Sequence, residues 1–226
     1  YNLMKLNISN VLAEKTMYNP KRTIKYKEIK NYVYGYQALA NISKARLDTY
    51  EHLHSDKNDS IYDNQPVQLN VFKTFDKLRH CGKLINQKQV HIILDADETI
   101  PDIIISREIE TAFYLLIDNA IKYTDENYDI HIKINILSNN IQIQIESIGP
   151  YNSPEEIPNI FNKGFRGKNA KEVEKNGQGI GLYTTKKICD RNNISILASS
   201  QDKKIILREN DYSIFKVVLK IPITNK

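Results

Sequence analysis

The chain has 226 residues and a formal net charge of +5, with 41% hydrophobic and 26% charged residues. These ordinary values leave room for one large globular domain or two small ones. The sequence has no apolar run of about 18 residues that could span a membrane. It does not indicate a nucleic-acid footprint, because the lysines are scattered among acids without interleaved aromatic residues. The chain opens at Tyr1 inside a helix-like pattern, without a signal peptide. We therefore expect a cytoplasmic fragment of a longer protein, with any membrane segment outside this chain.

Residues 1–60 show helical periodicity on both sides of a break. An Asn-Pro pair within residues 18–23 disfavours helix and favours a turn. A long amphipathic pattern then runs over residues 24–54. This arrangement predicts an αα-hairpin whose apolar stripe needs a partner chain to cover it, as in half of a dimeric four-helix bundle. The stripe contains Ile29, Val33, Tyr36, Leu39, Ala40, Ile42, Leu47, Tyr50 and Leu53.

A polar, turn-rich linker at residues 54–66 separates the hairpin from a second region, residues 65–226, in which strands and helices are mixed. The resulting fold class is α+β, with a two-layer sandwich in which helices cover one face of a mixed sheet. The predicted strands are 67–72, 90–96, 129–137, 141–148, 195–200 and 213–221. The predicted helices are 75–88, 106–124 and 181–192.

The end of the predicted helix 106–124 carries polar residues suited to binding a nucleotide. Asn119, Lys122 and Tyr123 lie on one helical face at i, i+3 and i+4 spacing. An amide oxygen there can hold Mg²⁺, the ammonium can neutralise a phosphate, and the phenol ring can lie against a purine. Taken alone, the same residues are also compatible with an ordinary exposed helix end.

Glycine-rich segments follow this helix. A strand ends at Gly149, and Phe165, Arg166 and a further glycine come after a short helix, where the arginine could reach a phosphate or remain a solvated loop charge. The segment "GQGIGL" then places Gly177, Gly179 and Gly181, three of the eight glycines in the chain, directly before Leu182 and a helix. Backbone N–H groups exposed by glycines at the start of a helix form an anion site.

In this order, the four segments resemble the Bergerat-fold ATP-binding domain shared by sensor histidine kinases, type II topoisomerases and related ATPases. "LLIDNAIKYT" (115–124) resembles the histidine-kinase N box, "SIGP" (147–150) a degraded G1 box, "IFNKGFRG" (160–167) the F box and "GQGIGL" (177–182) the G2 box. The resemblance covers about residues 65–222. The helical hairpin before it resembles the dimerisation and phosphotransfer domain of sensor histidine kinases.

The resemblance implies ATP and Mg²⁺ as ligands and assigns a role to individual residues. Asn119 is similar to the Mg²⁺ ligand, Lys122 to a phosphate contact, and Tyr123 to part of the adenine wall. Arg166 is similar to a γ-phosphate contact, and it follows Phe165 in the F box. Cofactor contacts are likewise implied for the G1 and G2 boxes: Ser147, Gly149, Gly177, Gly179, Gly181 and Leu182.

The sequence departs from the family pattern at two places. Ser147 stands where the family has an aspartate that accepts a hydrogen bond from the adenine amino group, and Tyr151 replaces the second glycine of that box. In addition, residues 1–15 contain no acceptor histidine, and Leu6 stands where one is expected. Leu115 occupies the position of the general-base glutamate of hydrolysing relatives; an apolar residue cannot activate water, so phosphoryl transfer is favoured over hydrolysis.

We therefore interpret the chain as the ATP-binding catalytic core of a two-component sensor histidine kinase. The resemblance implies transfer of the γ-phosphoryl group of Mg·ATP to a protein histidine and onward to the receiver domain of a response regulator, by a homodimer. The alternative is a dimeric signalling or scaffold module, similar to a pseudokinase, that binds nucleotide weakly or not at all. The departure at Ser147 favours this alternative, while the glycines of the G2 box favour the kinase.

Overall fold

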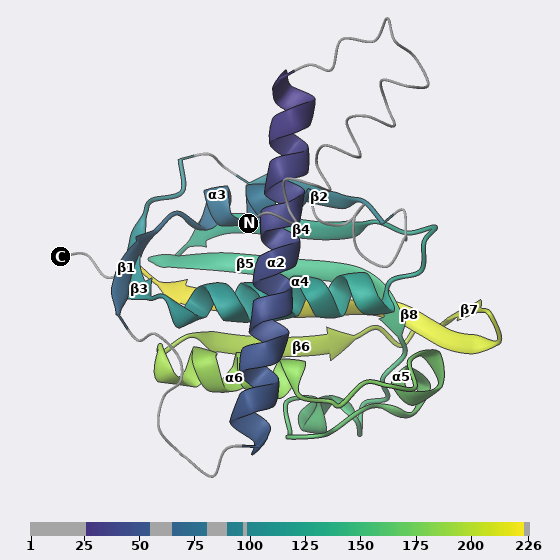
Figure 1. Cartoon of the computed structure of the whole chain (residues 1–226). Coiled ribbons are helices and arrows are strands. Elements are labelled where there is room, and N and C mark those ends of the chain that lie inside the picture. The colour runs from purple at the N-terminus through teal and green to yellow at the C-terminus, as the bar shows by residue number, and fades with distance from the viewer. Residues whose placement is uncertain (1–25, 55–64, 81–89, 97–98, 224–226) are drawn as a thin grey trace, which may run out of the picture.

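A computed structural model describes residues 26–54, 65–80, 90–96 and 99–223 (Figure 1). In the helix over residues 26–54, the side chains are described from residue 29 to residue 49. Within these residues, a six-stranded mixed sheet has the order β2-β4-β5-β8-β6, and β7 pairs with β8. β2 and β4 are parallel, whereas the other neighbours are antiparallel. The strands are β2 (Ile92–Ala96), β4 (Ile130–Leu137), β5 (Asn140–Pro150), β6 (Ser195–Ser200), β7 (Ile205–Leu207) and β8 (Asn210–Pro222).

Helices cover one face of this sheet. α4 (Glu108–Tyr123) and α6 (Gly181–Arg191) lie side by side on it (Figure 1). α3 (Val71–Leu78) joins this layer through Phe75, whose ring centroid lies 4.9 Å from that of Phe113 in α4. Between β5 and α6 the chain forms the short helices η1 (Ile157–Asn159) and α5 (Lys168–Val173). The α+β class predicted from the sequence is confirmed.

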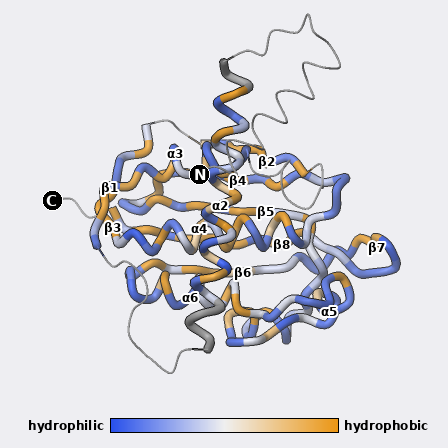
Figure 2. Tube along the Cα trace, viewed as in Figure 1, coloured by the Kyte–Doolittle hydropathy of each residue, from blue (hydrophilic) through white to orange (hydrophobic). Residues whose placement is uncertain are grey.

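The core lies between the helix layer and the sheet. Isoleucines alternate with polar residues along β4 and β5, so that every second side chain points to the helices, and Figure 2 shows this alternation of hydrophobic and hydrophilic residues along the strands. Register places Ile132, Ile145 and Val217 opposite one another on three neighbouring strands. Full burial of each such side chain stabilises the fold by about 1.5–3 kcal/mol.

α2 (Tyr26–His54) crosses the outer side of the helix layer and contacts α3, α4 and α6 (Figure 1). Its buried face overlaps the predicted stripe only in part. Ile42 of the stripe is buried, whereas Leu47 of the stripe is 63% exposed. The buried side chains of α2 are otherwise small, and together with Ile42 they form the face Gly35, Ala38, Ile42, Ala45 and Thr49. The first helix of the predicted hairpin falls in residues 1–25, outside the described part of the chain.

Short elements differ most from the prediction. A strand was predicted over 67–72, but β1 (Pro66–Leu69) ends before α3, because the side chain of Asn70 caps that helix by accepting a hydrogen bond from the Lys73 N–H at 2.8 Å. β1 pairs with β3 (Ile103–Ser106), which the sequence analysis had not identified. β7 and α5 were not predicted either. None of the described helices is long and apolar enough to cross a membrane.

Candidate functional site

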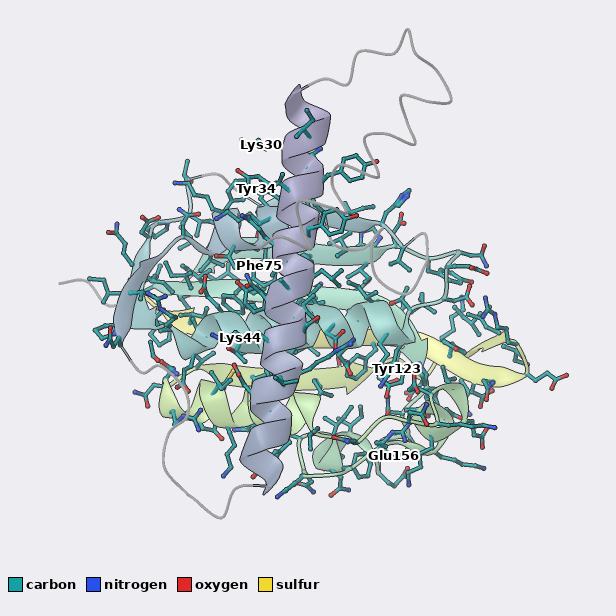
Figure 3. All side chains as sticks on the ribbon, viewed as in Figure 1. Lys30, Tyr34, Lys44, Phe75, Tyr123 and Glu156 are labelled. Atoms are coloured by element: carbon teal, nitrogen blue, oxygen red, sulfur yellow. The ribbon has the colours of Figure 1, made fainter. Side chains whose placement is uncertain are left out.

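The C-terminal half of α4 presents a polar stripe to a cavity of about 660 Å³. Leu115, Asp118, Asn119, Lys122 and Tyr123 line this cavity, and their spacing of three and four residues puts them on one side of the helix. Figure 3 labels Tyr123 at the end of α4, near the segment that carries α5. A volume of this size lies within the range of small-molecule sites.

The cavity brings together every candidate site residue named from the sequence. They come from α4, from the end of β5, from the segment between β5 and α6, and from the start of α6. The set is Asn119, Lys122, Tyr123, Ser147, Gly149, Phe165, Arg166, Gly177, Gly179, Gly181 and Leu182. Their roles in binding remain predictions, since geometry alone assigns no ligand.

β5 supplies the floor of the cavity. Ser147 is buried, and it lies on the same face of the strand as Ile141, Ile143 and Ile145, which point into the core. Gly149 continues that face, and a Cβ added there would lie at an ordinary 3.5 Å from Phe215 Cβ. The inward face of β5 therefore changes from apolar to polar where the core ends and the cavity begins.

Gly179 fixes the glycine-rich loop against the preceding segment. Its φ of +69° is a backbone conformation that favours glycine, and a Cβ there would lie 2.5 Å from the carbonyl oxygen of Phe165. The Gly164 N–H donates to the Gly179 carbonyl at 3.0 Å. The two segments consequently pass too close for any side chain at position 179.

Gly177 lies where two cations meet. A Cβ on this residue would lie 3.0 Å from Lys122 Nζ and 3.1 Å from Arg166 Nε. By contrast, a Cβ on Gly181 would have no atom within 4 Å, although Gly181 also lines the cavity. The first glycine thus permits the close approach of the two cations, and the third leaves open space at the start of α6.

Arg166 is held by the end of the segment that covers the cavity. Its Nη2 donates to the Ala170 carbonyl at 2.9 Å and also to the Glu174 carbonyl. Its Nε is buried and has no hydrogen-bond partner among the described residues. An unsatisfied, buried cationic N–H beside Lys122 is a costly arrangement that an anionic ligand would relieve.

Burial shifts the pKa values of Lys122 and Tyr123, the cationic and the aromatic side chain at the end of α4. It lowers the pKa of the Lys122 ammonium below its ordinary 10.5; Arg166 and Arg46 act in the same direction, whereas Glu174 and Asp118 oppose it. Burial raises the pKa of the Tyr123 phenol, which stays neutral at physiological pH. The site therefore concentrates positive charge around a partly desolvated cavity, which suits a polyanion.

The structure adds cavity residues that the sequence analysis had not assigned to the site. Asn152 lies beside Gly167, where an added Cβ would be 2.5 Å from its Oδ1. Arg46, Leu47 and Thr49 come from α2, far away in the sequence. For Asp118 the helical spacing was an available signal, but no sequence signal identifies the α2 residues. Leu6, the expected acceptor position, lies outside the described residues.

Comparison with known proteins agrees with this geometry. Residues 105–223, more than half of the chain, match the family described as "Histidine kinase-, DNA gyrase B-, and HSP90-like ATPase". The adaptive-response sensory kinase SasA of Crocosphaera subtropica is 33% identical over 107 residues, which are 46% of this chain and 28% of SasA. The signal transduction histidine-protein kinase ArlS of Staphylococcus aureus is 28% identical over 173 residues, 74% of this chain and 37% of ArlS. The chain thus spans only about a third of these relatives.

Solved structures of the histidine kinase ThkA share the fold. The nucleotide-free catalytic domain of ThkA superposes with a TM-score of 0.57 at 19% identity, covering 71% of this chain and 97% of that domain. A structure of ThkA in complex with the response regulator protein TrrA covers 99% of this chain and 59% of ThkA, with a TM-score of 0.55 at 17% identity.

The matched range, residues 105–223, includes the segments of α4, of the end of β5 and of the glycine-rich loop that line the cavity. Membership of this family implies ATP binding. The chain belongs to the histidine kinase-, DNA gyrase B- and HSP90-like ATPases, as the catalytic, ATPase-type region of a two-component sensor histidine kinase.

Proposed function

We propose that the cavity binds ATP together with Mg²⁺, and that the full-length protein transfers the γ-phosphoryl group to a protein histidine and then to the receiver domain of a response regulator. One observation carries the proposal: Lys122 Nζ and Arg166 Nε both lie within about 3 Å of a Cβ built on Gly177, inside a cavity of nucleotide size. Converging cations and accessible backbone are what a polyphosphate requires.

Each part of the cavity matches a part of Mg·ATP. The amide oxygen of Asn119 is a suitable hard ligand for Mg²⁺, which prefers oxygen and tolerates few protein ligands. Lys122 and Arg166 would hold the phosphates, and the loop from Gly177 to Gly181 would offer backbone N–H groups. Tyr123 and Ser147 would contact the base. Mg²⁺, when bound, would neutralise phosphate charge during transfer.

Leu115 supports phosphoryl transfer rather than hydrolysis. It lines the cavity one helical turn before Asn119 and is only 4% exposed. A side chain without a proton acceptor cannot activate water for attack on a phosphate. The phosphoryl group would then be transferred to a protein histidine, and no histidine is found among the described residues that line the cavity.

The proposed partners are a second copy of the chain and a response regulator. ThkA, which shares this fold, has been crystallised with its response regulator TrrA, and this supports the second partner. For the homodimer, the support is that part of the predicted stripe is not fully buried: Ile29, Val33 and Tyr36 are half-buried, and Leu47 is 63% exposed. We propose the division into a dimerisation hairpin, 1–60, and a catalytic domain, 65–226, on the same basis.

The direct test is calorimetric titration with a non-hydrolysable ATP analogue, with and without Mg²⁺. We expect Mg²⁺-dependent binding that Asn119→Ala weakens by at least roughly 10- to 100-fold, since even the loss of a residue that only supports a metal ligand typically has this effect. The matched control is Asn135→Ala on β4, because Asn135 is remote in the sheet register from the cavity. Absence of binding to the unmodified protein would instead support the scaffold alternative.

A further inference from the structure

α2 forms part of the wall of the nucleotide cavity. Arg46, Leu47 and Thr49 line the same cavity as Asn119 and Lys122. In Figure 3, Lys44 marks the part of α2 that passes over α4. The helix that precedes the catalytic region is therefore in direct contact with the site, and a change in its position would alter the site itself.

The contact between α2 and α4 is close and specific. Ala38, Ile42 and Ala45 are each at most 3% exposed, and small side chains at this face let the two helices approach closely. Asn41 Nδ2 donates to the Tyr114 hydroxyl at 2.9 Å. These contacts bring the next turn of α2 over the end of α4 that carries the cavity residues.

Arg46 and Asp118 form a two-pronged ion pair at this point. Arg46 Nε donates to Asp118 Oδ2 at 2.8 Å, and Nη2 donates to Oδ1. The Asp118 side chain is only 13% exposed, while that of Arg46 is 50% exposed. A carboxylate buried to this degree needs a compensating charge, and Arg46 supplies it from a different element.

Asp118 stands at a sensitive position for a polyanion site. It directly precedes Asn119 and lies one helical turn before Lys122, so its charge acts on the same cation that would bind phosphate. Without Arg46, the carboxylate would repel a nucleotide phosphate and compete with it for Lys122.

We propose that Arg46 is a positioning residue of the nucleotide site: by neutralising Asp118, it prevents that carboxylate from competing with the nucleotide for Lys122, and it makes nucleotide affinity depend on the docking of α2. This inference rests on the proposed function. Linkage requires the reverse effect as well, so that bound nucleotide favours the docked position of α2. The preceding helix and the ATP site are thereby coupled through one ion pair.

A double-mutant cycle tests the inference by titrating an ATP analogue with Mg²⁺ into four proteins. We expect Arg46→Gln to weaken binding by roughly tenfold, as a nearby unpaired charge does when partly screened. Asp118→Asn should bind at least as tightly as the unmodified protein, and it should restore affinity in the Arg46→Gln background. If Arg46 only anchored α2, Asp118→Asn would be as harmful as Arg46→Gln and would restore nothing.

Three outcomes overturn the inference: unchanged affinity in Arg46→Gln, tighter binding in Arg46→Gln, and no rescue by Asp118→Asn. Arg79→Gln is the matched control, because Arg79 also pairs with an aspartate, Asp76, at 2.7 Å, but on α3. If the unmodified protein binds nucleotide in an Asn119-dependent manner, failure of the cycle removes this inference alone. If it binds none, the proposed function falls as well.

Discussion

At the scale of single residues, positions 179 and 181 of the G2 segment carry glycine for different physical reasons. Gly179 is required by the fold itself, because of its positive φ and the 2.5 Å approach to Phe165. Gly181 has no such requirement, since an added Cβ would project into space with no atom within 4 Å. The fold does not require glycine at position 181, so we expect its absence of a side chain to matter for a ligand in the cavity. A substitution at 181 therefore tests binding, whereas one at 179 would also disturb the fold.

We predict that Gly181→Val weakens binding of an ATP analogue by at least about tenfold, which corresponds to about 1.4 kcal/mol, without lowering the thermal midpoint of unfolding. The added methyl groups would occupy the space at the start of α6 where an anion approaches the backbone. Gly181→Ala should give a smaller loss. Calorimetry and thermal unfolding on the same samples distinguish the effects; wild-type affinity in Gly181→Val would show that the ligand does not use this space.

At the scale of elements, a buried ion pair joins the beginning of α4 to the end of α6. The Glu108 side chain is 1% exposed and accepts from Arg191 Nη2 at 2.5 Å and from Asn192 Nδ2 at 2.8 Å. We predict that Glu108→Gln lowers the free energy of unfolding by about 1–3 kcal/mol, because a buried charge-assisted hydrogen-bond network is lost. Urea unfolding measures this change in the free energy of unfolding. Glu172→Gln, on the exposed surface of α5, should change it by less than about 0.5 kcal/mol; equal stability of the two variants would contradict the prediction.

The elements also show what the sequence can predict. Helical spacing is local, so it placed Asn119, Lys122 and Tyr123 on one face, and the family resemblance gave them their roles. β4 and β5 were identified because isoleucine alternates over many residues. The pairing of β1 with β3 depends on contacts across more than thirty positions, so four-residue strands leave too short a pattern. The face that α2 packs against the helix layer was not predicted, for another reason: a hydrophobic stripe is identified by large residues, whereas close helix contact selects small ones such as Ala38 and Ala45.

At the scale of the whole molecule, the nucleotide cavity lies where three parts of the fold meet: the helix layer, the end of β5 and α2. Its cations come from α4 (Lys122), from α2 (Arg46) and from the segment between β5 and α6 (Arg166), and burying them costs stability. Lys122 illustrates the conflict, because burial that lowers its pKa disfavours the ammonium in the folded protein. A site that is favourable for a polyanion is therefore unfavourable for the protein without its ligand.

This conflict predicts opposite pH dependences for stability and binding. The folded pKa of Lys122 lies below the unfolded value, so the unfolded chain binds more protons there, and the free energy of unfolding should rise as pH increases through the folded pKa. Bound phosphate favours the ammonium, so nucleotide binding should take up protons at alkaline pH and weaken over the same range. Calorimetry in two buffers with different ionisation enthalpies measures this uptake.

Replacing the lysine separates the two effects. We predict that Lys122→Met keeps or raises the free energy of unfolding at neutral pH, while it weakens binding by roughly 10- to 100-fold and removes the proton uptake, because a charge-assisted contact is worth about 1.5–3 kcal/mol. Lys220→Met, an exposed substitution on β8, should leave stability, affinity and proton uptake unchanged. A destabilised Lys122→Met that still binds with proton uptake would mean that Lys122 supports the fold, and that another group holds the phosphates.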